Sequence, residues 1–332
     1  IKKIGHNLKY DYAVFKSNGI DLQGITHDTM LQSYVNNSTD NRHDLNSVAE
    51  RILGVVPTSY DKVTKNLNEG EGFEKVPIEA ATGYAGEDAE LALRINNRLF
   101  PKISENEGLK SIYSDIEVPL ISVLSKMEMT GVLIDSEMLA QHSSELKSKM
   151  TSLETKAYTM AGETFNISSP KQIQEILFEK MKIPVIAKTP KGQPSTSESV
   201  LSDLSKDYEL PKIILDYRSI AKLCSSYTDK LPRQVNTKTG RIHANFHQAV
   251  TSTGRLSSSS PNLQNIPIRT QEGKKVREAF RAPFGKILIA ADYSQIELRI
   301  MAHISKDEAL VNAFKEEQDI HAATAAEVFE TN

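Results

Sequence analysis

The spacing of apolar residues predicts several helices. After Ser136 apolar side chains recur every three, four or seven positions, which is the interval of one helix face. These positions are Leu139, Leu146, Met150, Leu153 and Ala157. They predict a long amphipathic helix. A second helix is expected from Pro77, a residue suited to a first turn, to about Leu99, and a shorter one over residues 43–52.

Breaks in this pattern predict the turns and strands. Gly131–Asp135 is typical of a turn and a short strand that ends in a helix cap, and the glycines of Glu69–Gly72 indicate a loop. We expect a turn at Ser257–Pro261. The apolar run Ile287–Ala291 predicts a buried strand, and Ser294–Ile304 predicts a helix after it.

The middle of the chain carries a basic stretch followed by a helix start. Lys188–Pro194 combines lysines with two prolines and a glycine, so it should form an exposed loop. Ser195–Glu198 matches a capping box ahead of Val200 and Leu201.

Composition narrows the class of protein. The 332 residues are 39% hydrophobic and 25% charged, which fits about two or three folded domains. The longest apolar run is far shorter than the roughly 20 residues of a membrane span. The single Cys224 excludes an internal disulfide framework and a multi-cysteine zinc site, fits a reducing cytoplasm, and is most simply a small buried apolar group. A net charge of −3 neither favours nor excludes a nucleic-acid partner.

The two ends of the chain suggest a piece of a longer protein. The sequence begins with Ile1 and closes just after a helical-looking stretch, His321–Phe329. Neither end has the Gly, Pro and polar bias common at natural termini. We therefore expect a processed protein or an internal fragment.

The strongest chemical signal follows the apolar run that ends at Ala291. Asp292 comes directly after that run, and sites in α/β sheets gather where strands end. A buried carboxylate is costly unless it is paired, protonated or bound to a cation, and Mg²⁺ prefers oxygen ligands. Asp is also a favoured helix cap, so the residues alone leave a metal ligand and a cap both open.

The segment Asp292–Arg299, Asp-Tyr-Ser-Gln-Ile-Glu-Leu-Arg, is followed by Ile-Met-Ala-His and resembles the first palm motif of bacterial family A DNA polymerases. The resemblance implies that Asp292 holds two catalytic Mg²⁺ ions and that the Tyr293 carbonyl helps one of them. Glu297 would reject ribonucleotides. Gln295 and His321 would lie near the incoming nucleotide. Without the resemblance, His321 is better explained as a helix cap or a surface residue.

A polar stretch upstream resembles the primer–template contact motif of the same family. It comprises Thr251–Ser258 and Pro261–Arg269. Composition alone favours a polar turn, although a guanidinium and amides also suit minor-groove acceptors. By the resemblance Arg255 reaches the minor groove at the primer end. The residues that would touch the duplex nearby are Asn262, Gln264 and Asn265.

Two N-terminal patterns resemble the family's 3′–5′ proofreading exonuclease, which has an RNase H-like fold. They are Asn7–Asp11 and Tyr84–Asp88, with Asp28–Leu31 between them. Asp88 falls on one helical stripe with Tyr84, Leu91 and Ile95, where a carboxylate needs a basic partner or a metal. The resemblance makes Asp11 and Asp88 metal ligands and has Tyr84 orient the attacking water.

The stretch between these motifs resembles the polymerase thumb. Ser168–Gln172, the Lys188–Lys191 loop and Ser225–Lys230 would follow the duplex backbone, with Lys171 and Lys230 near phosphates. Each lysine taken alone is better explained as a solvated surface residue.

Taken along the chain, the resemblance implies three segments of a multidomain α/β and α+β protein. Residues 1–105 would be the C-terminal part of an RNase H-like exonuclease domain. Residues 106–232 would begin the polymerase domain and form a mainly helical thumb. Residues 233–332 would be the first half of the palm.

The implied activity is DNA-templated DNA synthesis from dNTPs by a two-metal mechanism, with proofreading, in DNA replication and repair. The cofactor would be Mg²⁺, with Mn²⁺ or Zn²⁺ as alternatives at the exonuclease site. The partners would be primer–template duplex, dNTPs and a single-stranded 3′ end, with no membrane. We expect a monomer in the bacterial cytoplasm, associated with the nucleoid.

Parts of the family's pattern are missing from these residues. The first exonuclease motif, the fingers helix and the later palm carboxylate are not found, so we expect the isolated chain to be inactive. An exonuclease sheet without its first strands should leave an open edge, with partial disorder or aggregation. A non-catalytic duplex-binding module remains the alternative. The Asp292 segment disfavours a stand-alone exonuclease, and Glu297 disfavours an RNA polymerase.

Overall fold

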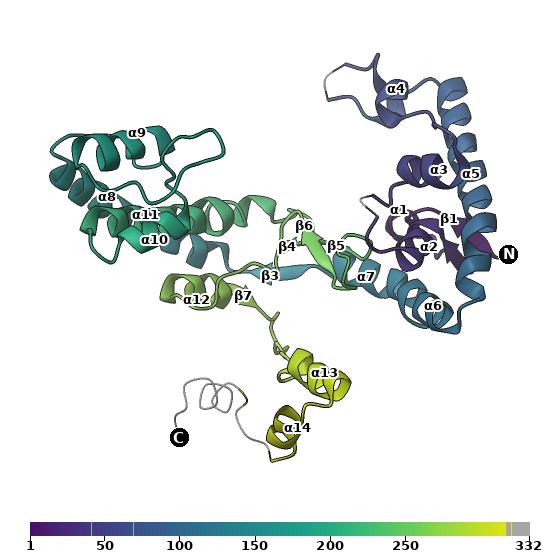
Figure 1. Cartoon of the computed structure of the whole chain (residues 1–332). Coiled ribbons are helices and arrows are strands. Elements are labelled where there is room, and N and C mark those ends of the chain that lie inside the picture. The colour runs from purple at the N-terminus through teal and green to yellow at the C-terminus, as the bar shows by residue number, and fades with distance from the viewer. Residues whose placement is uncertain (41, 69, 317–319, 321–332) are drawn as a thin grey trace. The chain divides into compact units, whose positions relative to one another are not determined.

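The computed structural model describes residues 1–40, 42–68, 70–316 and 320. It is mostly helical with three small sheets, and it divides into two compact units, Ile1–Arg281 and Ala282–Asn332 (Figure 1). None of the helices in the described ranges is long and apolar enough to cross a membrane.

The N-terminal part of the first unit pairs two parallel strands through a helical crossover. Strand β1 (Lys3–Gly5) pairs directly with β2 (Ile25–Asp28), and helix α1 (Leu8–Ser17) connects the two strands along the chain. The elements that follow are α2 (Thr29–Asn36), α3 (Leu45–Leu53), α4 (Tyr60–Thr64), the 3₁₀ turn Phe73–Lys75 and α5 (Ile78–Ser104). The predicted helices at 43–52 and from Pro77 are confirmed, and Asp44 caps α3 by accepting from the Ser47 N–H.

A connecting segment links this part to a second sheet. It comprises α6 (Glu107–Ser111), the π-helical stretch Ile112–Glu117 and α7 (Val118–Thr130). Strand β3 (Val132–Ile134) then lies between β4 (Arg241–Ile242) and β7 (Phe280–Arg281), antiparallel to both. The turn before β3 requires glycine: Gly131 has φ of 63°, and a Cβ there would lie 2.6 Å from the Ile242 carbonyl oxygen.

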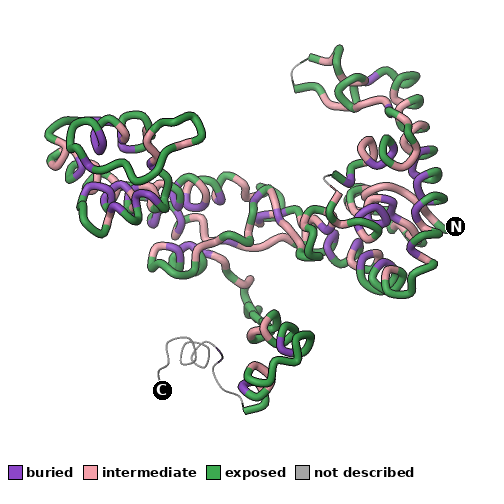
Figure 2. The backbone as a smooth tube through the Cα atoms, viewed as in Figure 1, coloured by how far each residue is buried: buried purple, intermediate pink, exposed green. Residues whose placement is uncertain are grey.

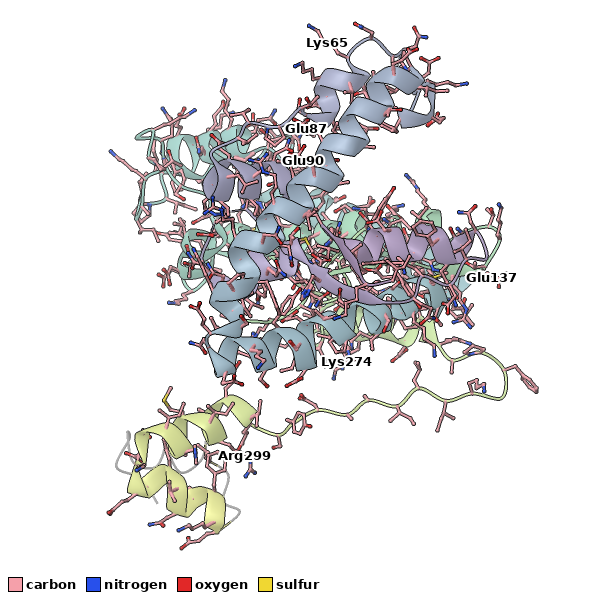
Figure 3. The ribbon with its side chains drawn as sticks, turned by 90° about the vertical axis from the view of Figure 1, so that its right-hand side faces the viewer. Lys65, Glu87, Glu90, Glu137, Lys274 and Arg299 are labelled. Carbon is pink, nitrogen blue, oxygen red and sulfur yellow. The ribbon has the colours of Figure 1, made fainter. Side chains whose placement is uncertain are left out.

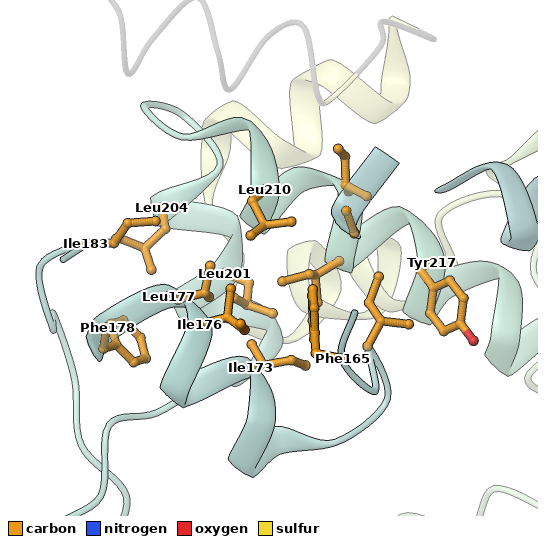
Figure 4. Packing of buried hydrophobic residues seen from close by; sticks show 14 of the residues in the cluster. Phe165, Ile173, Ile176, Leu177, Phe178, Ile183, Leu201, Leu204, Leu210 and Tyr217 are labelled. Atoms are coloured by element: carbon orange, nitrogen blue, oxygen red, sulfur yellow. The ribbon is translucent and has the colours of Figure 1, made fainter. Parts of the chain in front are cut away.

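The central helices enclose the largest apolar core. The long helix predicted from Ser136 is α8 (Ser136–Ala161), capped by Asp135. It packs against α11 (Glu209–Leu223), and the smaller helices α9 (Pro170–Gln174) and α10 (Glu198–Leu204) help to close the core shown in Figure 4. Two π-helical stretches, Glu175–Lys180 and Cys224–Thr228, and the 3₁₀ turn Pro232–Gln234 complete this region.

Two predictions made from the sequence concern this helical region, the capping box and the burial of Cys224. The capping-box prediction was wrong by two residues: Ser197, rather than Ser195, caps α10, since the Ser197 hydroxyl accepts from the Val200 N–H. The Ser195 hydroxyl instead accepts from the Ser197 N–H. Cys224 is buried in an apolar cluster, as expected.

A hairpin and one helix close the first unit. Strand β5 (Asn245–His247) pairs antiparallel with β6 (Ser257–Ser259), and α12 (Gln271–Glu278) follows. The turn predicted at Ser257–Pro261 was therefore mostly wrong, because the serines of β6 pair with β5 and only the last two residues of this stretch, Ser260 and Pro261, form a bend.

The second unit contains helices α13 (Ile296–Ser305) and α14 (Glu308–Lys315), which pack together. The helix predicted at Ser294–Ile304 is confirmed, but the buried strand predicted at Ile287–Ala291 was wrong. In the described structure no strand pairs with this stretch, and Ile289 is 83% exposed. The tube before α13 is mostly green, and therefore exposed, in Figure 2. An apolar run becomes a strand only when a neighbour takes up its N–H and C=O groups.

Candidate nucleic-acid interface and catalytic residues

A large cleft of about 1130 Å³ gathers three of the predicted DNA contacts. Lys230, which follows α11, lines it together with Asn262 and Asn265 from the loop after β6. Tyr227 joins the two walls, since its hydroxyl donates to the Asn265 carbonyl. The cleft thus combines an ammonium group with amide side chains, a chemistry that suits phosphates and base edges.

The loop that carries the amides is built around one buried hydroxyl. Ser258, 6% exposed, lies 3.2 Å from Asn262 Oδ1 and 3.3 Å from Gln264 Oε1, and it accepts from the Leu263 N–H. Gln264 also donates to the Leu256 carbonyl at 2.8 Å. The Gln264 amide therefore makes hydrogen bonds within the loop, while Asn262 and Asn265 line the cleft.

Arg255 lies on the exposed turn between β5 and β6. The turn is closed by the Thr251 hydroxyl, which donates to the Arg255 carbonyl at 2.7 Å. Gly254 has φ of 84°, which permits the reversal. Lys171 lies apart from the cleft, exposed on the short helix α9.

Asp292 lies in the second unit, exposed and just before the start of α13. Asp292 does not cap the following helix, because α13 has Gln295 at its N-cap position with φ of 53° and without a side-chain cap. The cap interpretation is therefore wrong. Tyr293 is exposed, Glu297 stands in the first turn of α13, and His321 lies outside the described residues.

A cation–π contact orders this second unit. Arg299 on α13, labelled in Figure 3, lies over the Phe314 ring of α14 at 4.5 Å and donates to the Ser294 carbonyl. The last residue of the Asp292 motif thus fixes the helix on which that motif ends.

On α5, Tyr84 and Asp88 lie one turn apart, as the stripe predicted. Burial raises the pKa of the Asp88 carboxyl, and a hydrogen bond from Tyr84 opposes that rise. Asp88 Oδ1 is buried without a hydrogen-bond partner. The neighbouring Glu87, seen on α5 in Figure 3, accepts from the Thr58 N–H.

Comparison with known proteins decides the family. A sequence model of DNA polymerase family A matches residues 136–332, and a model described as 3′-5′ exonuclease matches residues 1–104. The chain belongs to DNA polymerase family A. DNA polymerase I of Pseudomonas aeruginosa is 51% identical over 98% of this chain, and that of Rhizobium leguminosarum is 46% identical over 99%.

A solved structure supports the same family. The POL domain of Pol1 from M. smegmatis, in complex with DNA primer-template and dNTP, is similar with a TM-score of 0.84 and 32% identity. The match covers 98% of this chain and 54% of that chain. The chain spans about a third of the curated relatives' length, 36% of the Pseudomonas protein and 32% of the Rhizobium protein.

Family A polymerases and their exonuclease domains use divalent metal ions. The orphaned Asp88 oxygen fits such an ion, since a buried carboxylate oxygen needs a hydrogen bond or a cation. Burial likewise raises the pKa of Asp11, in the first turn of α1. Within the described ranges, however, no group of three or more His, Cys, Asp or Glu side chains is arranged to hold a metal.

One structural residue was missed from the sequence. Asp28 is fully buried, and its carboxylate accepts from the N–H groups of Asn7 and Leu8 at the start of α1. It also accepts from Met30 and Leu31 at the start of α2. Asp is a favoured helix cap, which could have indicated the second role, but only the parallel pairing of β1 and β2 brings α1 within reach.

Proposed function

We propose that the protein to which this chain belongs is a DNA-directed DNA polymerase with a 3′–5′ proofreading exonuclease, acting in replication and repair. The observation that carries the proposal is the cleft with Lys230, Asn262 and Asn265, in a chain of a polymerase family. The M. smegmatis relative was solved with primer-template and dNTP, so we expect the same partners here.

The roles of the residues follow from their chemistry. Lys230 and Lys171 would neutralise backbone phosphates, and such contacts supply affinity without sequence preference. Asn262, Gln264, Asn265 and Arg255 would hold the primer end, Gln264 by shaping the loop. Minor-groove acceptors are similar in every correct pair, so these contacts would test pair geometry.

In the second unit, Asp292 and the Tyr293 carbonyl would hold Mg²⁺, which stabilises the attacking 3′-oxygen and the leaving pyrophosphate when bound. Gln295 and His321 would contact the incoming nucleotide. Glu297 would crowd its sugar 2′ position and exclude ribonucleotides.

In the N-terminal segment, Asp11 and Asp88 would hold the exonuclease metals, Mg²⁺ with Mn²⁺ or Zn²⁺ as alternatives, and Tyr84 would orient the attacking water. The segments 1–105, 106–232 and 233–332 would serve as exonuclease, thumb and first half of the palm. We expect the complete protein to be a monomer of the bacterial cytoplasm, associated with the nucleoid.

The direct test is to separate the two activities in the complete parent polymerase. Asp292→Asn should reduce primer extension by about 10²- to 10³-fold, as loss of a charge-stabilising group does, while degradation of a single-stranded 3′ end persists. Asp88→Asn should do the reverse. Extension that survives Asp292→Asn would remove Asp292 from the proposed polymerase site. If the unsubstituted parent extended no primer, the duplex-binding module would become the better account.

A further inference from the structure

The turn that carries Arg255 is held from outside by two hydroxyl groups of the N-terminal segment. The Tyr34 hydroxyl donates to the Thr251 carbonyl at 2.8 Å, and the Ser38 hydroxyl donates to the Ser252 carbonyl at 2.9 Å. These contacts span more than 200 residues of sequence, and they engage two successive carbonyls at the start of the turn. The segment that matches the exonuclease family thus grips a loop of the segment that matches the polymerase family.

Tyr34 is a rigid donor. Its side chain is 4% exposed, and its ring lies edge-on to His43, with centroids 5.5 Å apart and planes at 87°. It sits near the end of α2, whose start is fixed by the buried Asp28. A hydroxyl held by ring packing gives up little freedom when it binds a carbonyl, so the contact defines where that carbonyl lies.

The rest of the turn is anchored at both ends. On the entry side the buried Gln248 donates to the Glu117 carbonyl at 3.0 Å and to its carboxyl at 2.6 Å. On the exit side Gln264 holds the Leu256 carbonyl. Between these anchors residues 252–255 are exposed, and the bonds from Tyr34 and Ser38 fix the carbonyls at the beginning of this stretch.

We propose that Tyr34, assisted by Ser38, is a positioning residue for Arg255, so that the exonuclease segment sets the conformation in which the turn meets the primer end. This inference rests on the proposed function of Arg255. The Thr251 side chain transmits the position, because its hydroxyl bonds the Arg255 carbonyl while its own carbonyl is held by Tyr34.

The test uses the complete parent polymerase with Tyr34→Phe, which removes only the hydroxyl, and Ser38→Ala. We expect each to raise the KM for primer–template about three- to tenfold, the usual worth of one hydrogen bond. The kcat at saturating duplex and the degradation of a single-stranded 3′ end should stay within about twofold. Tyr208→Phe, which deletes the same atom at the start of α11, is the matched control and should change neither value.

A double-mutant cycle with Arg255→Ala separates positioning from general stability. If Tyr34 acts through Arg255, Tyr34→Phe adds little to the KM of the Arg255→Ala enzyme. Fully additive effects, or a loss of all activities together with a lower melting temperature, would overturn the positioning role. So would an unchanged KM in both Tyr34→Phe and Ser38→Ala while Arg255→Ala raises it. If Arg255→Ala itself leaves KM unchanged, the proposed function of Arg255 fails instead.

Discussion

At the scale of single residues, Asp28 shows how one buried carboxylate organises two helices. Its oxygens accept four backbone N–H groups, two at the start of α1 and two at the start of α2. Asn7, at the N-cap of α1, supplies no side-chain cap, so Asp28 performs that task from β2. Because α1 carries Asp11 in its first turn, Asp28 helps to place a proposed metal ligand.

This arrangement predicts a specific pH dependence of stability. Burial raises the pKa of Asp28 to about 6, against the four N–H donors that lower it. The folded chain then binds this proton more tightly than the unfolded chain. The protonated Asp28 carboxyl therefore adds to the free energy of unfolding. This added stability is fully present below about pH 4 and is lost as the pH rises through about 6.

Asp28→Asn removes that titration. Between pH 4 and 7 the wild-type free energy of unfolding should fall relative to the variant by about 2 kcal/mol, at 1.36 kcal/mol per pKa unit. Urea unfolding followed by circular dichroism at several pH values measures it. His6, whose pKa burial lowers to about 4, changes stability in the opposite sense but is present in both proteins and cancels. Parallel stability curves would contradict the assignment.

At the scale of elements, the stretch before α13 exposes several large apolar side chains to solvent. Phe284, Ile287 and Ile289 are each more than three-quarters exposed, without a described strand beside them. Unpaired extended segments of this composition pair with other chains. We expect this stretch to drive association of the isolated chain.

Ile289→Lys should therefore reduce association of the isolated chain, measured by light scattering as a function of concentration. Gln193→Lys adds the same charge on the exposed loop before α10 and is the control. Equal effects of the two substitutions would mean that net charge, rather than the apolar stretch, governs association.

The core between α8 and α11 gives a second prediction for elements. Ile214 on α11 is fully buried, so Ile214→Ala should destabilise this region by about 2–5 kcal/mol. Ile186→Ala, at a half-exposed position, should change it by less than about 0.5 kcal/mol. Hydrogen exchange of the α8 and α11 amides measures both. Similar protection in the two variants would show that the cluster does not hold these helices together.

The helices and the short strand predicted within Gly131–Asp135, which is β3, were predictable, but the pairing of the other strands was not, for a physical reason. The start of α8 follows from Asp135 and from apolar spacing, which are local. The pairing of Ser257–Ser259 with β5, and the lack of pairing at Ile287–Ala291, depend on residues distant in sequence. The candidate site shows the same limit. The sequence motifs pointed to Lys230 and Asn265 as DNA contacts, but only the fold shows that the two residues line one cleft. No nearby sequence pattern indicates the role of Tyr34, because its hydrogen-bond partner Thr251 is distant in sequence.

At the scale of the whole molecule, the two units carry different parts of the proposed chemistry. The first holds the cleft, the Arg255 turn and the exonuclease carboxylates, and the second holds the Asp292 motif. In the described residues no group of three or more His, Cys, Asp or Glu side chains is arranged to hold a metal. We propose that these 332 residues bind duplex DNA and contribute residues to two catalytic centres without completing either.

The most direct measurement of that claim is a comparison of binding and turnover by the purified chain. We predict binding of a labelled primer–template that weakens with salt and with Lys230→Ala. We also predict no Mg²⁺-dependent extension or 3′ degradation above background. Primer extension by the chain alone that disappears in Asp292→Ala would contradict the account, because it would show a complete polymerase site within these residues.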